Sequence, residues 1–223
     1  MKVEFKFDKE KDMYNYWETV NYGKSYGYDF TKHLPKEIIK ICKKKDFNKC
    51  RKQLLKSIKN IYKNRLLKDT PKYLQESWNK INKEYFKRLE KITKKKFPNK
   101  KINVFLTTIP RCPYRPYWSP PAFYVPIFSS IPHVLQICGH ELMHIHLHNT
   151  DWWNKVEKEL GNKKTHDLKE SLTELLNLEF KELWIVKDEG YPNHKKLREY
   201  IHQQWKKKKD FDELTKKCIK KIK

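Results

Sequence analysis

Residues 140 to 144 read His-Glu-Leu-Met-His, so two imidazoles stand four positions apart with a carboxylate directly after the first. On a helix, residues four apart lie on one face, about 6 Å apart along the axis, so His140 and His144 can bind the same ion. Imidazoles at this spacing are typical ligands of Zn²⁺, and Glu141 can reach a water beside the ion as a general base. The segment therefore predicts a catalytic zinc site.

A catalytic zinc ion needs a third protein ligand while one position stays open. His148 shares the helix face, but eight residues of helix place it about 12 Å from His140, too far for one ion. Thr150 stands where the longer H-E-x-x-H-x-x-G-x-x-H motif has its third histidine. A downstream segment instead reads as a helix with leucines on one side and polar residues on the other. That polar face holds Glu170, Thr173, Glu174 and Asn177. We expect a carboxylate from this helix to be the third ligand.

These residues resemble a known family. The motif at residues 140–144, followed by Glu-Ser-Leu-Thr-Glu at residues 170–174, is similar to the gluzincins, the thermolysin-like branch of the zincin metallopeptidases. The resemblance is specific over residues 139–180 and extends back to the strands expected between 102 and 128. It implies a small twisted sheet packed against the helix of the motif, with an extended peptide bound along the edge strand of that sheet.

The resemblance also implies roles for individual residues. Glu170 would be the third zinc ligand, and Glu174 would support a ligating histidine, while Glu179 is a competing candidate for the ligand. Zn²⁺ would polarise the scissile carbonyl and lower the pKa of water, and Glu141 would take the proton and pass it to the leaving nitrogen. The implied activity is a zinc-dependent peptidase acting on peptides or unfolded protein segments.

The substrate strand is expected in the proline-rich part of the chain. Residues 122–128, Ala-Phe-Tyr-Val-Pro-Ile-Phe, resemble a strand interrupted by proline. Proline cannot donate to an inner ladder, so it confines such a strand to the edge of a sheet. We therefore predict that Phe123, Tyr124 and Val125 form the edge at which a peptide docks by strand addition.

The negative charge that develops on the substrate oxygen needs a hydrogen-bond donor. Directly after Gly190, a turn places Tyr191 and His194 beyond the helix of the third ligand. We predict these two residues as catalytic donors. Tyr200 and His202, on the helix that follows, are alternatives.

The elements that must position this chemistry can be read from hydrophobic periodicity. Residues 3–7 alternate apolar with charged residues, and residues 102–108 form a β-rich apolar run, so each indicates a strand. Apolar residues at three-and-four spacing predict helices over 54–66 and 74–92, separated by Asp-Thr-Pro at 69–71. The sequence thus predicts an α+β fold that is mostly helical, with a zincin-like core.

The domain organisation follows from length and composition. A chain of 223 residues with 38% hydrophobic content can bury one substantial core. We expect a single domain over residues 1–223, with an N-terminal helical part at 31–98 and a catalytic core at 100–205. Residues 206–223 are expected to form a basic helix or tail.

Charge and cysteine content restrict partners and location. The formal net charge is +24, but only six of the 51 basic residues are arginine, whereas base and phosphate recognition favours the guanidinium fork. This composition argues against a nucleic-acid partner. The longest stretch without charged residues is broken by five prolines, which predicts no membrane span. The five cysteines form no Cys-x-x-Cys pair and the first residues do not resemble a signal peptide, so we predict a cytoplasmic protein with reduced thiols.

Two other readings stay open at this point. One is a catalytically silent protein of zincin fold that binds a metal or a peptide. The other, which the scarcity of arginine disfavours, is a lysine-rich nucleic-acid-binding protein.

Overall fold

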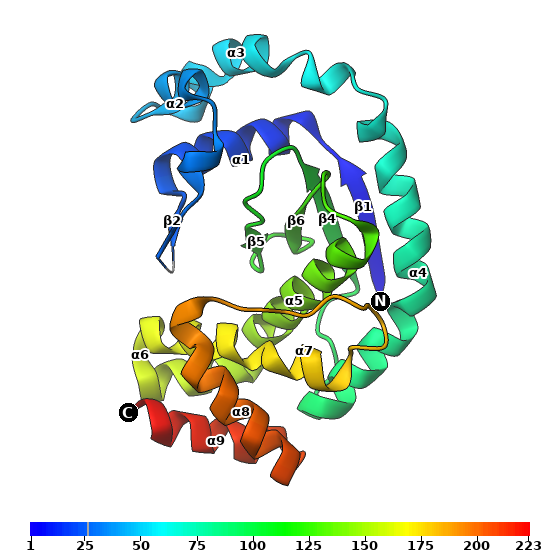
Figure 1. The fold of residues 1–223 in the computed structure, drawn as a ribbon, viewed down its shortest axis with the longest axis vertical. Coiled ribbons are helices and arrows are strands. Elements are labelled where there is room, and N and C mark those ends of the chain that lie inside the picture. The colour runs from blue at the N-terminus through cyan, green and yellow to red at the C-terminus, as the bar shows by residue number, and fades with distance from the viewer. Residues whose placement is uncertain (26) are drawn as a thin grey trace.

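The computed structural model describes residues 1–25 and 27–223 and has a mostly helical α+β fold (Figure 1), which confirms the predicted fold class. The strands are β1 (Lys2–Phe7), β2 (Lys24–Ser25), β3 (Tyr28–Asp29), β4 (Lys101–Thr107), β5 (Tyr114–Arg115) and β6 (Ala122–Pro126). The α-helices are α1 (Lys9–Tyr22), α2 (Lys36–Cys42), α3 (Phe47–Ile58), α4 (Leu66–Thr93), α5 (Ile131–Asn149), α6 (Asp151–Leu172), α7 (Glu174–Glu179), α8 (Lys195–Lys207) and α9 (Phe211–Ile222). Short 3₁₀ turns are η1 (Phe30–His33), η2 (Ile61–Lys63) and η3 (Pro192–His194).

The main sheet has the strand order β1-β4-β6-β5. β1, β4 and β6 are parallel, and β5 runs antiparallel to β6. Because side chains alternate across a strand, Val104 and Leu106 of β4 face the main core while Phe105 packs with Tyr124 on the other face. β4 is therefore buried on both faces, which explains its continuous apolar run.

The predicted position of the substrate strand is wrong in one respect. β6, which contains Phe123, Tyr124 and Val125, is an inner strand, because β5 pairs with its outer side at Phe123 and Ala122. All three predicted residues are fully buried. Pro126 is compatible with an inner strand, since it stands at the last position of β6 and interrupts no inner ladder. The edge of the sheet on this side is β5.

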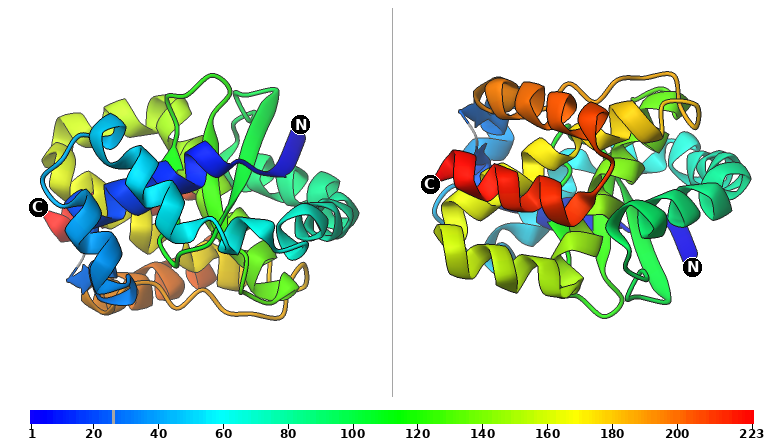
Figure 2. Two further views of the ribbon diagram at one scale, coloured as in Figure 1. Left: turned by 90° about the horizontal axis from the view of Figure 1, so that it is seen from above. Right: turned by 90° about the horizontal axis from the view of Figure 1, so that it is seen from below.

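The helices fall into two groups joined by the sheet and by α4. Figure 1 shows α1, α2 and α3 at one end of the molecule, α6 to α9 at the other, and α4 running along β1 between them. The end views in Figure 2 show α2 and α3 stacked over α1 from above, and α8 and α9 from below. α5 packs against β6, α4 and α6, so the helix predicted to hold the metal lies in the middle of the molecule.

The boundaries of the two predicted helices between 54 and 92 differ from the expectation. The first ends at Ile58, and the second begins at Leu66, so Asp-Thr-Pro at 69–71 lies inside α4. Pro71 is the sixth residue of α4, beyond the first four N–H groups, so α4 lacks the one helical hydrogen bond that residue 71 would donate to the Leu67 carbonyl. The predicted apolar stripe of α4, including Leu74, Trp78 and Leu89, is buried as expected.

The C-terminal residues form a docked helix. Phe211, Leu214 and Cys218 of α9 are buried in the main core, so residues 211–222 are part of the packed structure. Of the alternatives for this segment, helix and tail, the structure has the helix. Among the helices of the described residues, none combines the length and the apolar character needed to cross a bilayer.

Candidate metal centre

α5 carries His140 and His144 and is one of the most deeply buried helices of the protein. It begins after Ser130 with Pro132 in its first turn. Directly before His140, Gly139 lets Trp184 approach closely, since a Cβ at this position would lie 2.3 Å from the Trp184 ring. The Gly139 carbonyl also accepts a hydrogen bond from Tyr85 Oη at 2.7 Å. The backbone that presents the first histidine is therefore held by packing on both sides.

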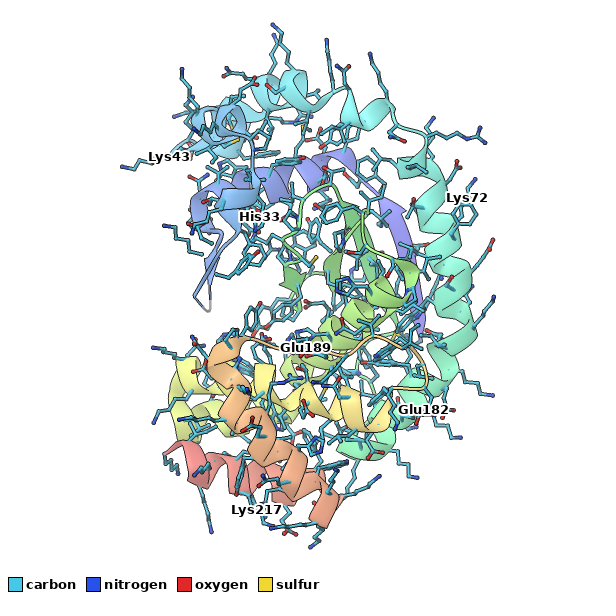
Figure 3. The ribbon with its side chains drawn as sticks, in the orientation of Figure 1. His33, Lys43, Lys72, Glu182, Glu189 and Lys217 are labelled. Atoms are coloured by element: carbon cyan, nitrogen blue, oxygen red, sulfur yellow. The ribbon has the colours of Figure 1, made fainter. Side chains whose placement is uncertain are left out.

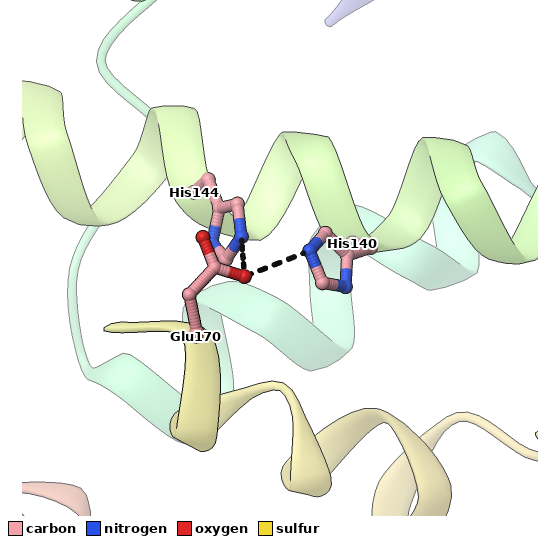
Figure 4. A group of neighbouring side chains, drawn as sticks. All are labelled: His140, His144 and Glu170. Atoms are coloured by element: carbon pink, nitrogen blue, oxygen red, sulfur yellow. Dashed lines mark hydrogen bonds and ion pairs between the residues drawn. The ribbon is translucent and has the colours of Figure 1, made fainter. Parts of the chain in front are cut away.

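α6 brings Glu170 to these histidines. The helix is broken at Gly161, whose positive φ of 73° and extended ψ of 167° are readily adopted only by glycine. The break redirects the second half of α6 across α5, and Glu170 then faces the two imidazoles (Figure 4). We call His140, His144 and Glu170 the His–Glu cluster.

The geometry of the His–Glu cluster suits one metal ion. Glu170 Oε2 lies 3.1 Å from His144 Nε2 and 3.4 Å from His140 Nε2. One ligand atom from each of the three residues lies within 4.8 Å of the others. Two imidazole nitrogens and one carboxylate oxygen are a donor set that zinc accepts, and such a set leaves a fourth position open. The structure thus brings together the three residues predicted as ligands.

Two buried polar atoms beside the cluster support this fit. Glu141 Oε2 and His144 Nδ1 are enclosed and have no hydrogen-bond partner among the described residues. A buried polar group without a partner costs free energy, and a ligand bound in the adjoining cavity would offset this cost for groups that border it. Glu141 projects from the same helix turn as His140 and borders the same cavity.

The electrostatics of the cluster favour a cation. Burial alone would raise the pKa of Glu170, yet the charges of His144 and Lys169 outweigh it and hold this pKa well below the ordinary value. Burial likewise lowers the pKa of His140, but the charge and hydrogen bond of Asp188 outweigh it and raise this pKa. Burial raises the pKa of Glu141 to about 7. The ionised Glu170 carboxylate therefore lies beside a second carboxyl group, that of Glu141, which can take up a proton near neutrality.

Asp188, not Glu174, contacts a histidine of the His–Glu cluster. Asp188 Oδ2 accepts from His140 Nδ1 at 2.6 Å and from Gln136 Nε2 at 2.8 Å, which orients the imidazole with Nε2 toward Glu170. The predicted role of Glu174 is wrong, because α6 ends at Leu172 and Glu174 begins a new helix with another orientation. Its carboxylate instead lies 3.0 Å from Arg198 and 2.9 Å from His202 Nδ1.

Arg198 holds the loop that delivers Asp188. Its guanidinium lies 3.0 Å from Asp188 Oδ1 and donates to Thr173 Oγ1 at 2.6 Å and to the Asp188 carbonyl. Asn177 bonds the Asp188 backbone on both its N–H and C=O, at 2.8 and 2.9 Å. Contacts from Arg198 and Asn177 therefore fix the position of Asp188 in a loop without regular secondary structure. Arginine is scarce in this lysine-rich chain, and Arg198 is the only arginine after residue 115, which is the one signal that sequence reasoning could have used.

The cluster lies on the wall of a cavity of about 410 Å³. Its other walls are Phe30 of η1, residues 110–114 before and within β5, and residues 188–191. Figure 3 labels Glu189 on this last loop, in the middle of the molecule between the two groups of helices. The cavity therefore gives a ligand access to the cluster from the side of β5.

The predicted oxyanion donors lie in different places. Tyr191 borders the cavity, as a donor there must, and its catalytic role stays a prediction. His194 is buried with Nε2 3.1 Å from Asp167 Oδ1, and it is not among the residues that line the cavity. Of the alternatives, His202 pairs with Glu174, and the side chain of Tyr200 packs against the main core.

The competing ligand Glu179 accepts from Trp205 Nε1 at 2.7 Å and lies outside the His–Glu cluster.

Two further residues of the cavity were not foreseen. Lys169, directly before Glu170, is only 1% exposed, and Tyr114 of β5 contacts it. In the sequence, Lys169 cannot be distinguished from the many surface lysines. β5 is too short to show the alternation of apolar and polar residues that marks a strand. Only the fold brings the two side chains together.

Comparisons with models of protein families, with curated proteins and with solved structures found no match to this chain. The functional argument therefore depends on the site itself.

Proposed function

We propose that this chain is a zinc-dependent metallopeptidase that hydrolyses peptide bonds in peptides or unfolded proteins. The observation that supports this most is the convergence of His140, His144 and Glu170, with Glu141 beside them, on the wall of one cavity. Three protein ligands and an accessible cavity are what a catalytic zinc site needs, whereas a structural zinc site is closed by four.

His140, His144 and Glu170 would hold the ion, and Asp188 would keep His140 in the orientation that presents Nε2. When bound, zinc polarises a carbonyl and lowers the pKa of water. The rest of the chemistry belongs to Glu141. Its carboxylate accepts a proton from the attacking water as the water oxygen bonds to the carbonyl carbon. It then gives this proton to the amide nitrogen as the C–N bond breaks, so one water yields a carboxylic acid and an amine.

The substrate would bind along β5, which replaces the predicted docking strand. Tyr124 N donates to Pro113 O at 3.2 Å, and Tyr114 lies opposite Phe123. Neighbouring residues of a strand direct their backbone groups to opposite sides, so the N–H and C=O of Tyr114 are directed away from β6. An extended peptide can pair with these two groups by strand addition and lie across the cavity. This docking mode favours unfolded segments, because a folded protein rarely offers a free extended backbone.

We also propose a cytoplasmic location. All five cysteines are free thiols, and four of them are buried. Such thiols are typical of proteins from a reducing compartment.

The test is hydrolysis of an unfolded protein, β-casein, by the purified full chain loaded with one equivalent of zinc. We expect cleavage that stops with 1,10-phenanthroline and returns with added zinc. Glu141→Gln should lower kcat by about 10³-fold, because the base is lost, and should retain zinc. Glu76→Gln, at an exposed position of α4, is the matched control and should leave kcat unchanged.

The outcome that contradicts the proposal is zinc binding without cleavage of any unfolded substrate. It would favour the silent metal-binding or peptide-binding protein over the enzyme. Equal cleavage by the parent and by Glu141→Gln would show that the activity comes from a contaminant or from another site.

A further inference from the structure

Lys169 is a buried cation at the metal centre. Its side chain is only 1% exposed, and it lies on the turn of α6 that carries Glu170. Nζ lies 3.0 Å from Glu170 Oε1 and donates to Tyr114 Oη at 2.8 Å, with the Tyr114 ring 4.3 Å below it. A lysine this deeply buried is rare unless it is paired. Here it contacts the carboxylate oxygen of Glu170 that does not face the histidines.

Tyr114 continues a chain of hydrogen bonds to the surface. Its hydroxyl lies 2.7 Å from His148 Nε2, and His148 Nδ1 lies 3.2 Å from the hydroxyl of Tyr117, which is 77% exposed. Burial, and then the charge of Lys169, lower the pKa of His148 to about 3, so this imidazole is neutral near pH 7. Burial raises the pKa of Tyr114, so its phenol stays protonated.

The direction of this chain follows from the donors available. The Tyr114 oxygen accepts from Lys169, so its single O–H donates to His148 Nε2, and His148 Nδ1–H donates to Tyr117. The phenol of Tyr114 therefore has no proton left for a substrate. Arg111, another cation on the cavity wall, is held by Glu18 at 2.5 Å.

Lys169 has one donor left. A lysine ammonium has three N–H groups, and the described residues offer its Nζ two acceptors, Tyr114 Oη and Glu170 Oε1. Lys169 also lines the cavity, together with Glu141 and the His–Glu cluster. Because Lys169 borders the cavity, its remaining N–H is available to a ligand that lies there beside Glu170.

We propose that Lys169 is a catalytic residue that donates its third N–H to the carbonyl oxygen of the scissile amide, where negative charge accumulates during hydrolysis. This inference rests on the proposed peptidase function. A preorganised cation stabilises such an oxygen without reorganisation, because Tyr114 and Glu170 already fix the position of Lys169. Lys169 thereby takes the role that the sequence analysis gave to Tyr191 and His194.

The test compares two small probes that need no substrate side chains. Acetohydroxamate binds zinc through oxygens that can accept from Lys169, whereas ethanethiol binds zinc through sulfur, a poor acceptor. Their affinities for the zinc-loaded full chain are measured by calorimetry for the parent and for Lys169→Met. We expect Lys169→Met to weaken acetohydroxamate at least tenfold and to leave ethanethiol unchanged. With β-casein as substrate, kcat should fall by about 10²–10³-fold at unchanged KM.

A second variant tests the proposal if Lys169→Met does not fold. Tyr114→Phe removes the acceptor that orients Lys169 and leaves its charge, so kcat and acetohydroxamate affinity should fall roughly tenfold, in keeping with misplacement of a catalytic group. Lys163→Met, at an exposed lysine of α6 outside the cavity, is the matched control and should leave acetohydroxamate affinity unchanged. Unchanged acetohydroxamate affinity in both Lys169→Met and Tyr114→Phe, or an equal loss for both probes, would overturn the proposal.

The outcomes separate this inference from the proposed function. If the chain binds zinc but cleaves no peptide, the proposed peptidase function is wrong. The affinities of the two probes then still test whether Lys169 donates to an oxygen at the metal site. Cleavage and zinc binding that survive Lys169→Met keep the peptidase and remove Lys169 from its mechanism. A chain that binds no zinc removes both.

Discussion

Two buried polar clusters in this protein differ in how many hydrogen bonds their carboxylates accept. In the first, Asp12 of α1 accepts from Thr107 Oγ1, Thr108 N, Thr108 Oγ1 and Tyr62 Oη, at 2.7, 2.9, 2.6 and 2.9 Å. We call these residues the Asp12 cluster. In the second, the His–Glu cluster, the neighbouring Glu141 Oε2 and the ring nitrogen His144 Nδ1 have no partner among the described residues. The first cluster is enclosed and the second borders a cavity.

The comparison teaches how to tell a structural carboxylate from a functional one. A buried carboxylate that accepts four hydrogen bonds ties its own helix to the elements that donate them, in this case α1 to η2 and the end of β4. A buried carboxylate without a partner destabilises the fold and is kept because it acts on something else. Asp12 and Glu141 are both buried carboxylates, so the number of hydrogen bonds and the bordering cavity separate them.

The largest effect that tests this contrast is on stability. Asp12→Ala leaves the donors of Thr107, Thr108 and Tyr62 buried without an acceptor, so the free energy of unfolding should fall by about 3 kcal/mol. Urea denaturation of the zinc-free chain measures this loss. Glu76→Ala, at an exposed position of α4, should change the free energy little. Zinc affinity at a temperature where both variants are folded should match that of the parent.

Urea denaturation of Glu141→Gln tests the other side of the contrast between the two clusters. An amide is less costly to bury than a carboxylate without partners, so the free energy of unfolding should stay level or rise by about 1 kcal/mol. A loss as large as that of Asp12→Ala would mean that Glu141 is structural, and the contrast between the two clusters would fail.

A smaller effect is expected on metal affinity. Asp188→Asn keeps the shape of the side chain but removes the charge that orients His140, so zinc affinity should fall by about 10–100-fold. Competition with a chromophoric chelator measures it. Glu174→Gln is the matched control, because Glu174 pairs with Arg198 and His202 and contacts neither histidine of the cluster. Equal losses in the two variants would remove the distinction between Asp188 and Glu174.

The smallest effect concerns a carboxylate at the surface. Hydrogen bonds from Lys155 and then Lys95 lower the pKa of Asp151 from 3.8 to about 2. Because the pKa is lower in the folded state, the stabilisation is present above the unfolded pKa and is lost as the pH falls through about 2. The exposed pair is screened, so Asp151→Asn should cost roughly 0.5 kcal/mol at pH 6. The free energies of unfolding of the parent and of Asp151→Asn, measured across the acid range, should converge at low pH. A difference that stays constant with pH would assign the effect to packing.

The sequence predicted the parts of the site that depend on helix geometry. His140 and His144 follow from a spacing of four, and Glu170 from the polar face of an amphipathic helix together with the family resemblance. These positions were predictable because the relation between residues on a helix is fixed by its period. The same reasoning gave the wrong role to Glu174, because a helix break at Thr173 changes the face on which it lies.

The rest of the site depends on contacts that no local pattern encodes. Asp188 comes from an irregular loop that is held by Arg198 and Asn177, residues from two other helices. β5 is a strand of two residues that makes β6 an inner strand, and a segment so short has no hydrophobic period. Burial of Lys169 likewise depends on the approach of Tyr114 across the cavity.

The most direct test of the central claim is X-ray diffraction at the zinc absorption edge from crystals of the full chain grown with one equivalent of zinc. We predict one anomalous peak per chain, bonded to His140 Nε2, His144 Nε2 and an oxygen of Glu170 at about 2.0–2.2 Å. A chain without a peak between these residues, or a peak bonded to other side chains while His140 and Glu170 stay in direct contact, would contradict the account.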